Sequence, residues 1–168
     1  QEQENINKQL VDSQNELRLI MDTSAEGIYG IDLEGNCTFC NKSCLKLLGY
    51  EEHEQLLGKN MHRQIHYAKR DGSEFPVEEC NIYKALRQSD GTHISDEVFY
   101  KADGTTMDVE YYSYPQFKDG KITGAVVTFL DISDRRRKEA EIEYLSCHDL
   151  LTGLYNRRFF EEELKRLD

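Results

Sequence analysis

The sequence predicts an α+β protein with a five-stranded antiparallel sheet, helices on one face of the sheet, and a further helix at each end of the chain. Three observations predict this class. Segments rich in β-branched and aromatic residues fall into two groups, and glycine-containing turns typical of hairpins join the segments within each group. A stretch with helical spacing of apolar residues separates the two groups. Highly charged segments with helical patterns flank the whole.

Residues 1–22 are predicted to form the first helix, because no turn residues interrupt them and their apolar positions follow a heptad spacing. Ser13 occupies the one polar position of that seam. Two arrangements are compatible with the pattern: a helix packed on its own domain, or a two-stranded coiled coil with a second copy of the chain. The seam consists of Ile6, Leu10, Leu17 and Ile20.

The first group of strands is a hairpin. Residues 27–32 are short and β-rich, residues 33–36 read as a turn, and residues 37–41 return as the second strand. A short helix then fits residues 42–48, with Gly49 as its stop.

The middle of the chain has helical patterns with several breaks. Residues 51–57 and 61–67 form two short pieces, and residues 76–88 form a third with Pro76 at its beginning. We expect these pieces to cover one face of the sheet.

The second group comprises three longer strands, at residues 93–101, 105–115 and 121–133. An Ala-Asp-Gly turn joins the first two, and Asp-Gly is a hairpin signal. Residues 125–130 of the last strand are nearly all apolar. A strand covered on both sides needs such a run, so we expect it at the centre of the sheet.

Composition excludes several functional classes. The 168-residue chain has 21 basic and 32 acidic residues and a net charge of −11, which argues against nucleic acid as a partner. No run of 18 apolar residues occurs, so no membrane span is expected, and the polar start is unlike a signal peptide. The odd count of 5 cysteines favours a reducing, cytoplasmic location over a disulfide framework. Residues 134–147 interleave both charges, as expected of a solvated linker helix.

The order of elements and five short motifs resemble the PAS family. The motifs are the opening at 22–28, the hairpin return and asparagine at 35–41, the Leu-Gly-Tyr at 48–50, the Lys-Ala-Asp-Gly-Thr turn at 101–105, and the Phe-Leu-Asp-Ile-Ser-x-Arg exit at 129–135. The resemblance implies a PAS sensor domain over residues 23–133, preceded by the helix 1–22 and followed by the linker helix 134–147.

A second resemblance begins at the end of the chain. Residues 149–159 look like the Asp-x-Leu-Thr-Gly-Leu-x-Asn-Arg-Arg-x-Phe start of a GGDEF diguanylate cyclase domain. Residues 148–168 would then be the truncated start of that domain, and the family's catalytic loop and metal-binding carboxylates are not in this sequence. The chain itself is therefore not expected to be an enzyme. In agreement with this, its sequence contains no Gly-rich phosphate loop and no plausible Ser/His/Asp set.

The two resemblances together imply a signal-input module for a GGDEF domain in cis, which makes cyclic di-GMP across a homodimer. The junction after the last strand is the expected signal relay, with Asp131 able to pair with Arg135 and Ser133 or Asp134 able to cap the linker helix. The alternatives are a ligand-free PAS dimerisation module and a metal-, haem- or redox-sensing PAS domain.

PAS cores hold a cavity between the sheet and their long helix, and members bind haem, flavin, small acids, metals or nothing. The Asn-Cys-Arg-Phe-Leu-Gln motif of photoactive flavin cores and the Cys-x-x-Cys-His motif of c-type haem are both missing here, and residues 76–88 contain no histidine. The cofactor therefore stays undetermined. The candidate cavity residues are His62, Arg63, His66, Tyr67, Cys80, Tyr83, Tyr112 and Tyr114.

Several histidines and cysteines are candidate metal ligands. His62 and His66 are four residues apart on one predicted helix, so they share a face. Cys37 and Cys40 are three apart in a predicted strand and should project to opposite faces unless the strand bends. The alternative is that the cysteines are small buried hydrophobes and the histidines are surface or helix-end residues. The full candidate set is Cys37, Cys40, Cys44, His62, His66 and Cys80.

Overall fold

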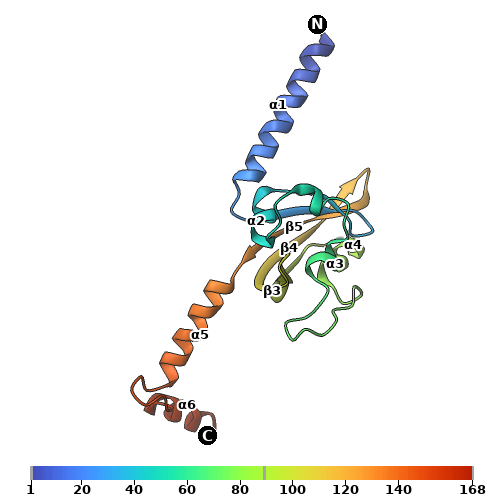
Figure 1. The fold of residues 1–168 in the computed structure, drawn as a ribbon. Helices are drawn as coiled ribbons and strands as arrows, with labels where there is room; N and C mark the ends of the chain where they lie inside the picture. Colours follow the sequence, from blue (N-terminus) through green and yellow to red (C-terminus); the bar gives the residue numbers. More distant parts are fainter. Residues whose placement is uncertain (1, 89, 168) are drawn as a thin grey trace. The chain divides into compact units, whose positions relative to one another are not determined.

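The computed structural model of the chain describes residues 2–88 and 90–167 (Figure 1). The chain divides into two compact units, Gln1–Asp131 and Ile132–Asp168. The first unit holds the helices α1 (Glu2–Thr23), α2 (Lys42–Leu48), η1 (His53–Gln55, a 3-10 helix), α3 (Met61–Ile65) and α4 (Asn81–Arg87). Its strands are β1 (Gly27–Ile31), β2 (Cys37–Cys40), β3 (Thr92–Tyr100), β4 (Thr106–Lys118) and β5 (Lys121–Asp131).

The five strands form one sheet in the order β2-β1-β5-β4-β3, and every neighbouring pair is antiparallel. The predicted α+β class and the central place of the last strand are therefore confirmed. Ala125, Val127 and Phe129 of β5 are buried, whereas the residues between them face the other side and are only partly covered.

The short helices α2, α3 and α4 lie on one face of the sheet, where the core forms (Figure 1). Tyr111 on β4 points into this core and is fully buried. Tyr112 and Tyr114 point to the opposite face, where they are 37% and 55% exposed. Their predicted place in a cavity is therefore wrong: strand alternation puts them on the side that carries no helices.

Helix α2 begins and ends where the sequence predicts. The side chain of Asn41 accepts a hydrogen bond from the Cys44 backbone N–H at the start of the helix. Gly49 ends it in the left-handed conformation, with φ of 76°, which glycine adopts without steric cost.

The middle helices are shorter than predicted. Only His53–Gln55 of the first piece is helical, as a 3-10 turn, and the third piece begins at Asn81 instead of Pro76. Residues 76–80 form consecutive turns, in which the N–H of Glu79 donates to the carbonyl of Pro76. The shortened helix places Cys80 at its N-cap position.

Strand β2 contains an irregularity that overturns a predicted orientation. Phe39 pairs with Gly30, and Cys37 pairs with Ile31, so Thr38 is an extra residue on this strand. Because of this bulge, Cys37 and Cys40 both face the buried side, although a regular strand would separate them.

The second unit contains α5 (Ser133–Cys147) and α6 (Arg157–Leu167). Helix α5 has no buried residues, as expected of a solvated linker. Asn156 precedes α6, and its side chain accepts a hydrogen bond from the Phe159 N–H. None of the helices in the described ranges is both long and apolar enough to cross a bilayer.

Candidate functional site

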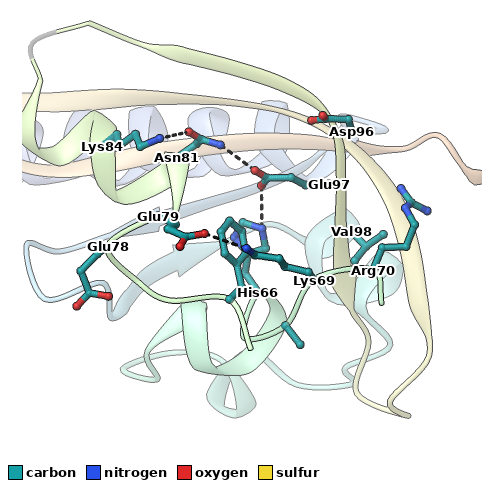
Figure 2. A pocket seen from close by; sticks show the side chains of 12 residues that line it. His66, Lys69, Arg70, Glu78, Glu79, Asn81, Lys84, Asp96, Glu97 and Val98 are labelled. Atoms are coloured by element: carbon teal, nitrogen blue, oxygen red, sulfur yellow. Dashed lines mark hydrogen bonds and ion pairs between the residues drawn. The ribbon is translucent and has the colours of Figure 1, made fainter. Parts of the chain in front are cut away.

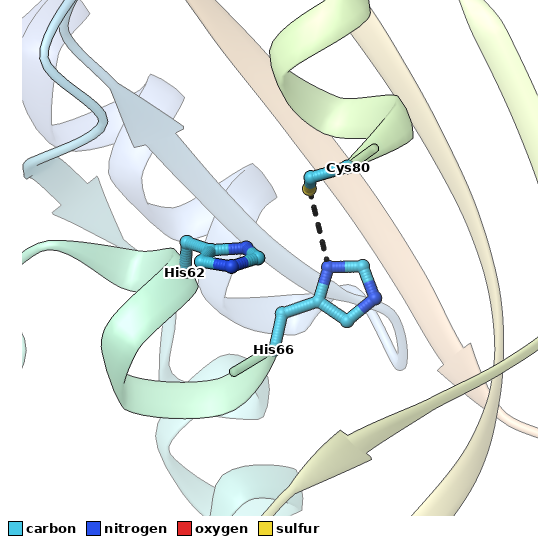
Figure 3. Close-up of side chains that lie close together, drawn as sticks. All are labelled: His62, His66 and Cys80. Carbon is cyan, nitrogen blue, oxygen red and sulfur yellow. Dashed lines mark hydrogen bonds between the residues drawn. The ribbon is translucent and has the colours of Figure 1, made fainter. Parts of the chain in front are cut away.

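Two histidines and a cysteine meet between α3 and α4, over the inner face of the sheet (Figure 3). His62 lies within α3, His66 ends that helix, and Cys80 precedes α4. One nitrogen from each ring and the Cys80 Sγ all lie within 4.8 Å of one another. His66 Nδ1 is 3.3 Å from Cys80 Sγ. The exposed fractions are 9% for His62 and 1% for each of the other two.

The outer nitrogens of both rings are held by acceptors. His62 Nε2 is 2.8 Å from the Phe75 carbonyl oxygen, so this nitrogen carries a proton and donates it. His66 Nε2 forms an ion pair with the Glu97 carboxylate at 2.9 Å. The remaining nitrogen of each ring is thereby left to face Cys80.

Glu97 is the centre of a small polar network on β3. Its two carboxylate oxygens accept hydrogen bonds from the Tyr111 hydroxyl at 2.7 Å and from the Asn81 amide at 2.8 Å, in addition to the His66 ion pair. Burial raises the pKa of Glu97, but hydrogen bonding to His66 and Tyr111 outweighs burial, so the pKa lies below its ordinary value.

The cysteine and the histidine beside it have strongly shifted proton affinities. Burial raises the pKa of the Cys80 thiol, but the neighbouring His62 ring and the hydrogen bond with His66 outweigh burial and lower it to about 6. Burial lowers the pKa of His66, but its hydrogen bonds to Cys80 and Glu97 raise it to about 9. Both shifts act in the direction that favours a thiolate beside an imidazolium.

A small enclosed cavity of about 10 Å³ adjoins these side chains. This volume accommodates an ion or a single water and is far below the several hundred Å³ of a site for an organic cofactor. Tyr29 also lines the cavity, and its buried hydroxyl has no hydrogen-bond partner in the part of the chain that the structure describes. The full lining is Tyr29, Ile31, Met61, His62, His66, Cys80, Ile82 and Tyr83.

An open cleft of about 590 Å³ lies on the other side of His66 (Figure 2). Its size suits a small organic ligand. Charged side chains of both signs surround it, and they are largely engaged with one another: Lys69 Nζ is 2.9 Å from Glu79, and Arg70 pairs with Asp108. The cleft therefore offers few uncommitted charges for a ligand to recognise.

The predicted cavity residues are only partly brought together. His62, His66, Cys80 and Tyr83 line the enclosed cavity, and His66 alone also reaches the open cleft. Arg63 and Tyr67 are exposed and line neither space. The prediction for these two is therefore wrong: they lie on the outer side of α3 and just beyond its end.

The other candidate ligands form a second cluster around β2. Cys37, Cys40 and Cys44 are all buried in this cluster, and Cys40 Sγ is 3.3 Å from His53 Nδ1. Hydrogen bonds from the other two thiols lower the pKa of Cys40, whereas the same contacts raise the pKa of Cys37 and Cys44. Cys37 also donates to the Phe39 carbonyl at 3.4 Å, so the thiols of this cluster have partners within the folded chain.

The predicted relay residues lie at the end of the sheet and the start of α5. Asp131 ends β5, and its carboxylate is 4.0 Å from Lys101 Nζ. Arg135 on α5 is 4.0 Å from Glu139. Ser133 is the first helical residue, and Ile132, which has no side-chain hydrogen bond to give, holds the N-cap position. Neither Ser133 nor Asp134 is therefore the N-cap of α5.

Glu97, Tyr29 and His53 were not among the predicted site residues. Each lies in or beside a segment that reads as ordinary strand or loop, and only the folded chain brings it to the histidines and cysteines. The one available signal for Glu97 was its position directly before three apolar or aromatic residues, at 98–100.

Comparisons with known proteins agree with this architecture. The PAS domain of an HTR-like protein from Haloarcula marismortui superposes with a TM-score of 0.61 at 20% identity, covering 77% of this chain and 99% of that one. The PAS domain of Bordetella pertussis BvgS superposes with a TM-score of 0.53 at 22% identity, covering 82% and 98%. These likenesses establish the fold.

Two curated relatives match at the sequence level. One is described as probable diguanylate cyclase DgcE of Escherichia coli strain K12 and is 29% identical over 163 residues, which is 96% of this chain. The other is the uncharacterized protein y4lL of Sinorhizobium fredii, 28% identical over 166 residues. The chain spans only 14% and 19% of the length of these relatives.

The family model described as the PAS fold matches residues 15–132, well over half of the chain. This range ends at the junction between the sheet and α5. Together with the five-stranded antiparallel sheet and the helices on one of its faces, the match identifies a sensory and non-catalytic fold. The chain belongs to the PAS family.

Proposed function

We propose that this chain is the signal-input part of a diguanylate cyclase, in which the PAS core regulates a GGDEF domain that begins after α5. The observation that supports this proposal most strongly is the order of the elements along the chain. The central strand β5 leads into α5, and the resemblance to a GGDEF start begins at residue 149, directly after that helix. The similarity to DgcE supports the proposal, because it spans 96% of the chain. A cyclase acts on GTP, so the proposal carries a cytoplasmic location with it.

The proposal includes a homodimer with a second copy of this chain. The heptad seam of α1 is more than half exposed at each of its four positions, Ile6, Leu10, Leu17 and Ile20. Exposed apolar residues at heptad spacing are the residues that a parallel partner helix buries in a coiled coil. Ile142 and Leu145 on α5 are also exposed, at 67% and 44%. The helices that precede and follow the core in the sequence thus both carry exposed apolar residues for a homodimer.

The first prediction concerns the rotational phase of α5 in the full-length protein. Each residue inserted into a helix rotates the downstream part of the chain by about 100° around the helix axis. Two extra residues after Glu139 therefore turn the end of α5 to nearly the opposite direction, and seven restore its direction to within about 20°. We expect cyclase output to change strongly with the two-residue insertion and to return toward the wild-type value with the seven-residue insertion. Cyclic di-GMP formation by the purified proteins measures this.

The control inserts the same residues into the exposed turn between β4 and β5, at Asp119 and Gly120. These insertions leave the phase of α5 unchanged, so output is expected to stay near wild type. Output that declines steadily with inserted length, without recovery at seven residues, would contradict a helical relay.

A second candidate function, a dimerisation module without an organic ligand, is favoured by one observation. The interior cavity measures only about 10 Å³, because side chains from α3, α4 and the sheet fill the space. In that case the exposed surfaces of α1 and the outer sheet face serve assembly alone. Deletion of residues 1–22 would then abolish the dimer, and no organic ligand would change the behaviour of the wild-type chain.

A further inference from the structure

We propose that His62, His66 and Cys80 form a binding site for a single borderline transition-metal ion of the zinc(II) class. The donor atoms already lie within 4.8 Å of one another. Bond lengths of about 2.3 Å to sulfur and 2.0–2.1 Å to nitrogen place two such ligands about 3.6 Å apart around a tetrahedral ion. The observed separation of Cys80 Sγ and His66 Nδ1 is 3.3 Å, so this pair of ligands needs only a small adjustment.

The polar contacts behind the histidines, one hydrogen bond and one ion pair, have the form that metal sites use. A ligating histidine usually donates its other ring N–H to a carbonyl or carboxylate, which fixes the ring and leaves the free lone pair directed at the ion. Here the Phe75 carbonyl holds His62 Nε2 and the Glu97 carboxylate holds His66 Nε2. Both Nδ1 atoms are thereby presented on the side of Cys80.

One of these donors has no partner in the described chain. His62 Nδ1 is buried and makes no hydrogen bond, although its ring is fixed through Nε2. Burying a lone pair without a partner is unfavourable, and an ion between the three side chains would satisfy it. The cysteine cluster around Cys40 differs in this respect, since its thiols and His53 bond to one another.

The donor set and the cavity define the class of ion. Two imidazole nitrogens and one thiolate suit zinc, cobalt or copper, whereas magnesium and calcium prefer oxygen ligands. Three protein ligands leave a fourth position open. The cavity of about 10 Å³ is lined by the three candidate ligands and by Tyr29, whose hydroxyl has no partner in the described chain, so a water in this cavity or Tyr29 itself could complete the shell.

The site joins two elements that are also linked by a hydrogen bond from Asn60, which caps α3, to the Tyr83 hydroxyl on α4. His62 and His66 belong to α3, and Cys80 starts α4, which contacts β3, β4 and β5. A bound ion would tie the beginning of α4 to α3 across the core. A metal ion would be the input signal of the proposed function, so the role of the ion in signalling rests on that proposal. Metal binding itself is measured on this chain, without any cyclase domain.

The test uses the 168-residue chain after removal of metals with a chelator. Zinc is titrated against a competing chromophoric chelator, and cobalt(II) is titrated while the absorbance spectrum is recorded. We expect one ion per chain and, with cobalt, a thiolate-to-metal charge-transfer band. Cys80→Ser should abolish the band, and His62→Gln should weaken zinc binding by about 100-fold or more. Circular dichroism of the metal-free variants establishes that each is folded.

Matched controls separate this site from the second cysteine cluster. Cys40→Ser and His53→Gln should leave the stoichiometry and the cobalt band unchanged. Glu97→Gln keeps all three ligands but loses the ion pair behind His66, so zinc affinity should fall by roughly 10- to 100-fold while the band remains. Absence of binding by the folded wild-type chain, persistence of the band in Cys80→Ser, or its loss in Cys40→Ser would each overturn the proposal. None of these outcomes depends on cyclase output.

Discussion

Replacing Asn41 with alanine is expected to lower the free energy of unfolding of the PAS core by about 4 kcal/mol, at about 1 kcal/mol for each of four hydrogen bonds. The Asn41 side chain is fully buried. Its oxygen accepts from the N–H groups of Ile28 and Cys44, and its amide donates to the carbonyls of Met21 and Glu26. One side chain thus joins the end of α1, the first strand and the start of α2. Urea unfolding followed by circular dichroism measures the loss.

Asn60→Ala is the matched control, because Asn60 also caps a helix and its side chain makes three hydrogen bonds. It is only partly buried, so water replaces the lost partners, and a cost of about 1 kcal/mol is expected. Equal losses in the two variants would show that Asn41 is an ordinary cap without the bridging role. The carbonyl of Met21 belongs to α1, so Asn41→Ala should also weaken the attachment of that helix.

The sequence was most informative where structure is decided locally. Helix α2 is recognisable because a capping asparagine and a stop glycine bound it, and both act within one turn. The central place of β5 is recognisable because its apolar run fits only a strand with neighbours on both sides. The predicted start of α4 was wrong because the turns after Pro76 use contacts three residues apart, which resemble the first turn of a helix.

The candidate site was predictable only in part, because two bulges hide which residues face the core. Cys37 and Cys40 are three residues apart in β2 but face the same side of the sheet. Ile94 and Glu97 are likewise three residues apart in β3, and they face the same side because their pairing partners, Tyr111 and Val109, both point inward. A regular strand places residues three apart on opposite faces. The spacing of His62 and His66 was visible in the sequence, but their meeting with Cys80 and Glu97 depends on tertiary structure.

Replacing Glu97 with alanine is expected to lower the free energy of unfolding by about 3 kcal/mol in metal-free buffer, because removing one partner of a buried ion pair leaves the other uncompensated. The change also leaves the Tyr111 hydroxyl and the Asn81 amide without their acceptor. Glu97→Gln keeps an acceptor for these two groups and should lose about half as much. The same urea unfolding experiment, with a chelator present, measures both.

Glu79→Ala provides the comparison for an exposed pair. Glu79 lies 2.9 Å from Lys69 Nζ, but the side chains are 56% and 46% exposed, so the expected loss is under about 1 kcal/mol. A similar loss for Glu79→Ala and Glu97→Ala would mean that solvent screens the His66–Glu97 pair as effectively as a surface pair, and Glu97 would then have no special structural role.

Zinc separates a structural role of Glu97 from a role in positioning His66. An ion that binds only the folded chain stabilises it by about 2.7 kcal/mol at a free concentration of 100 times the dissociation constant. The wild-type chain should gain this amount, and Cys80→Ser should gain almost nothing at the same zinc concentration. Glu97→Ala should gain clearly less than wild type, since a ring without its carboxylate partner is a weaker and less ordered ligand. A full gain in Glu97→Ala would assign Glu97 to the stability of the core alone, because His66 would then bind the ion equally well without it.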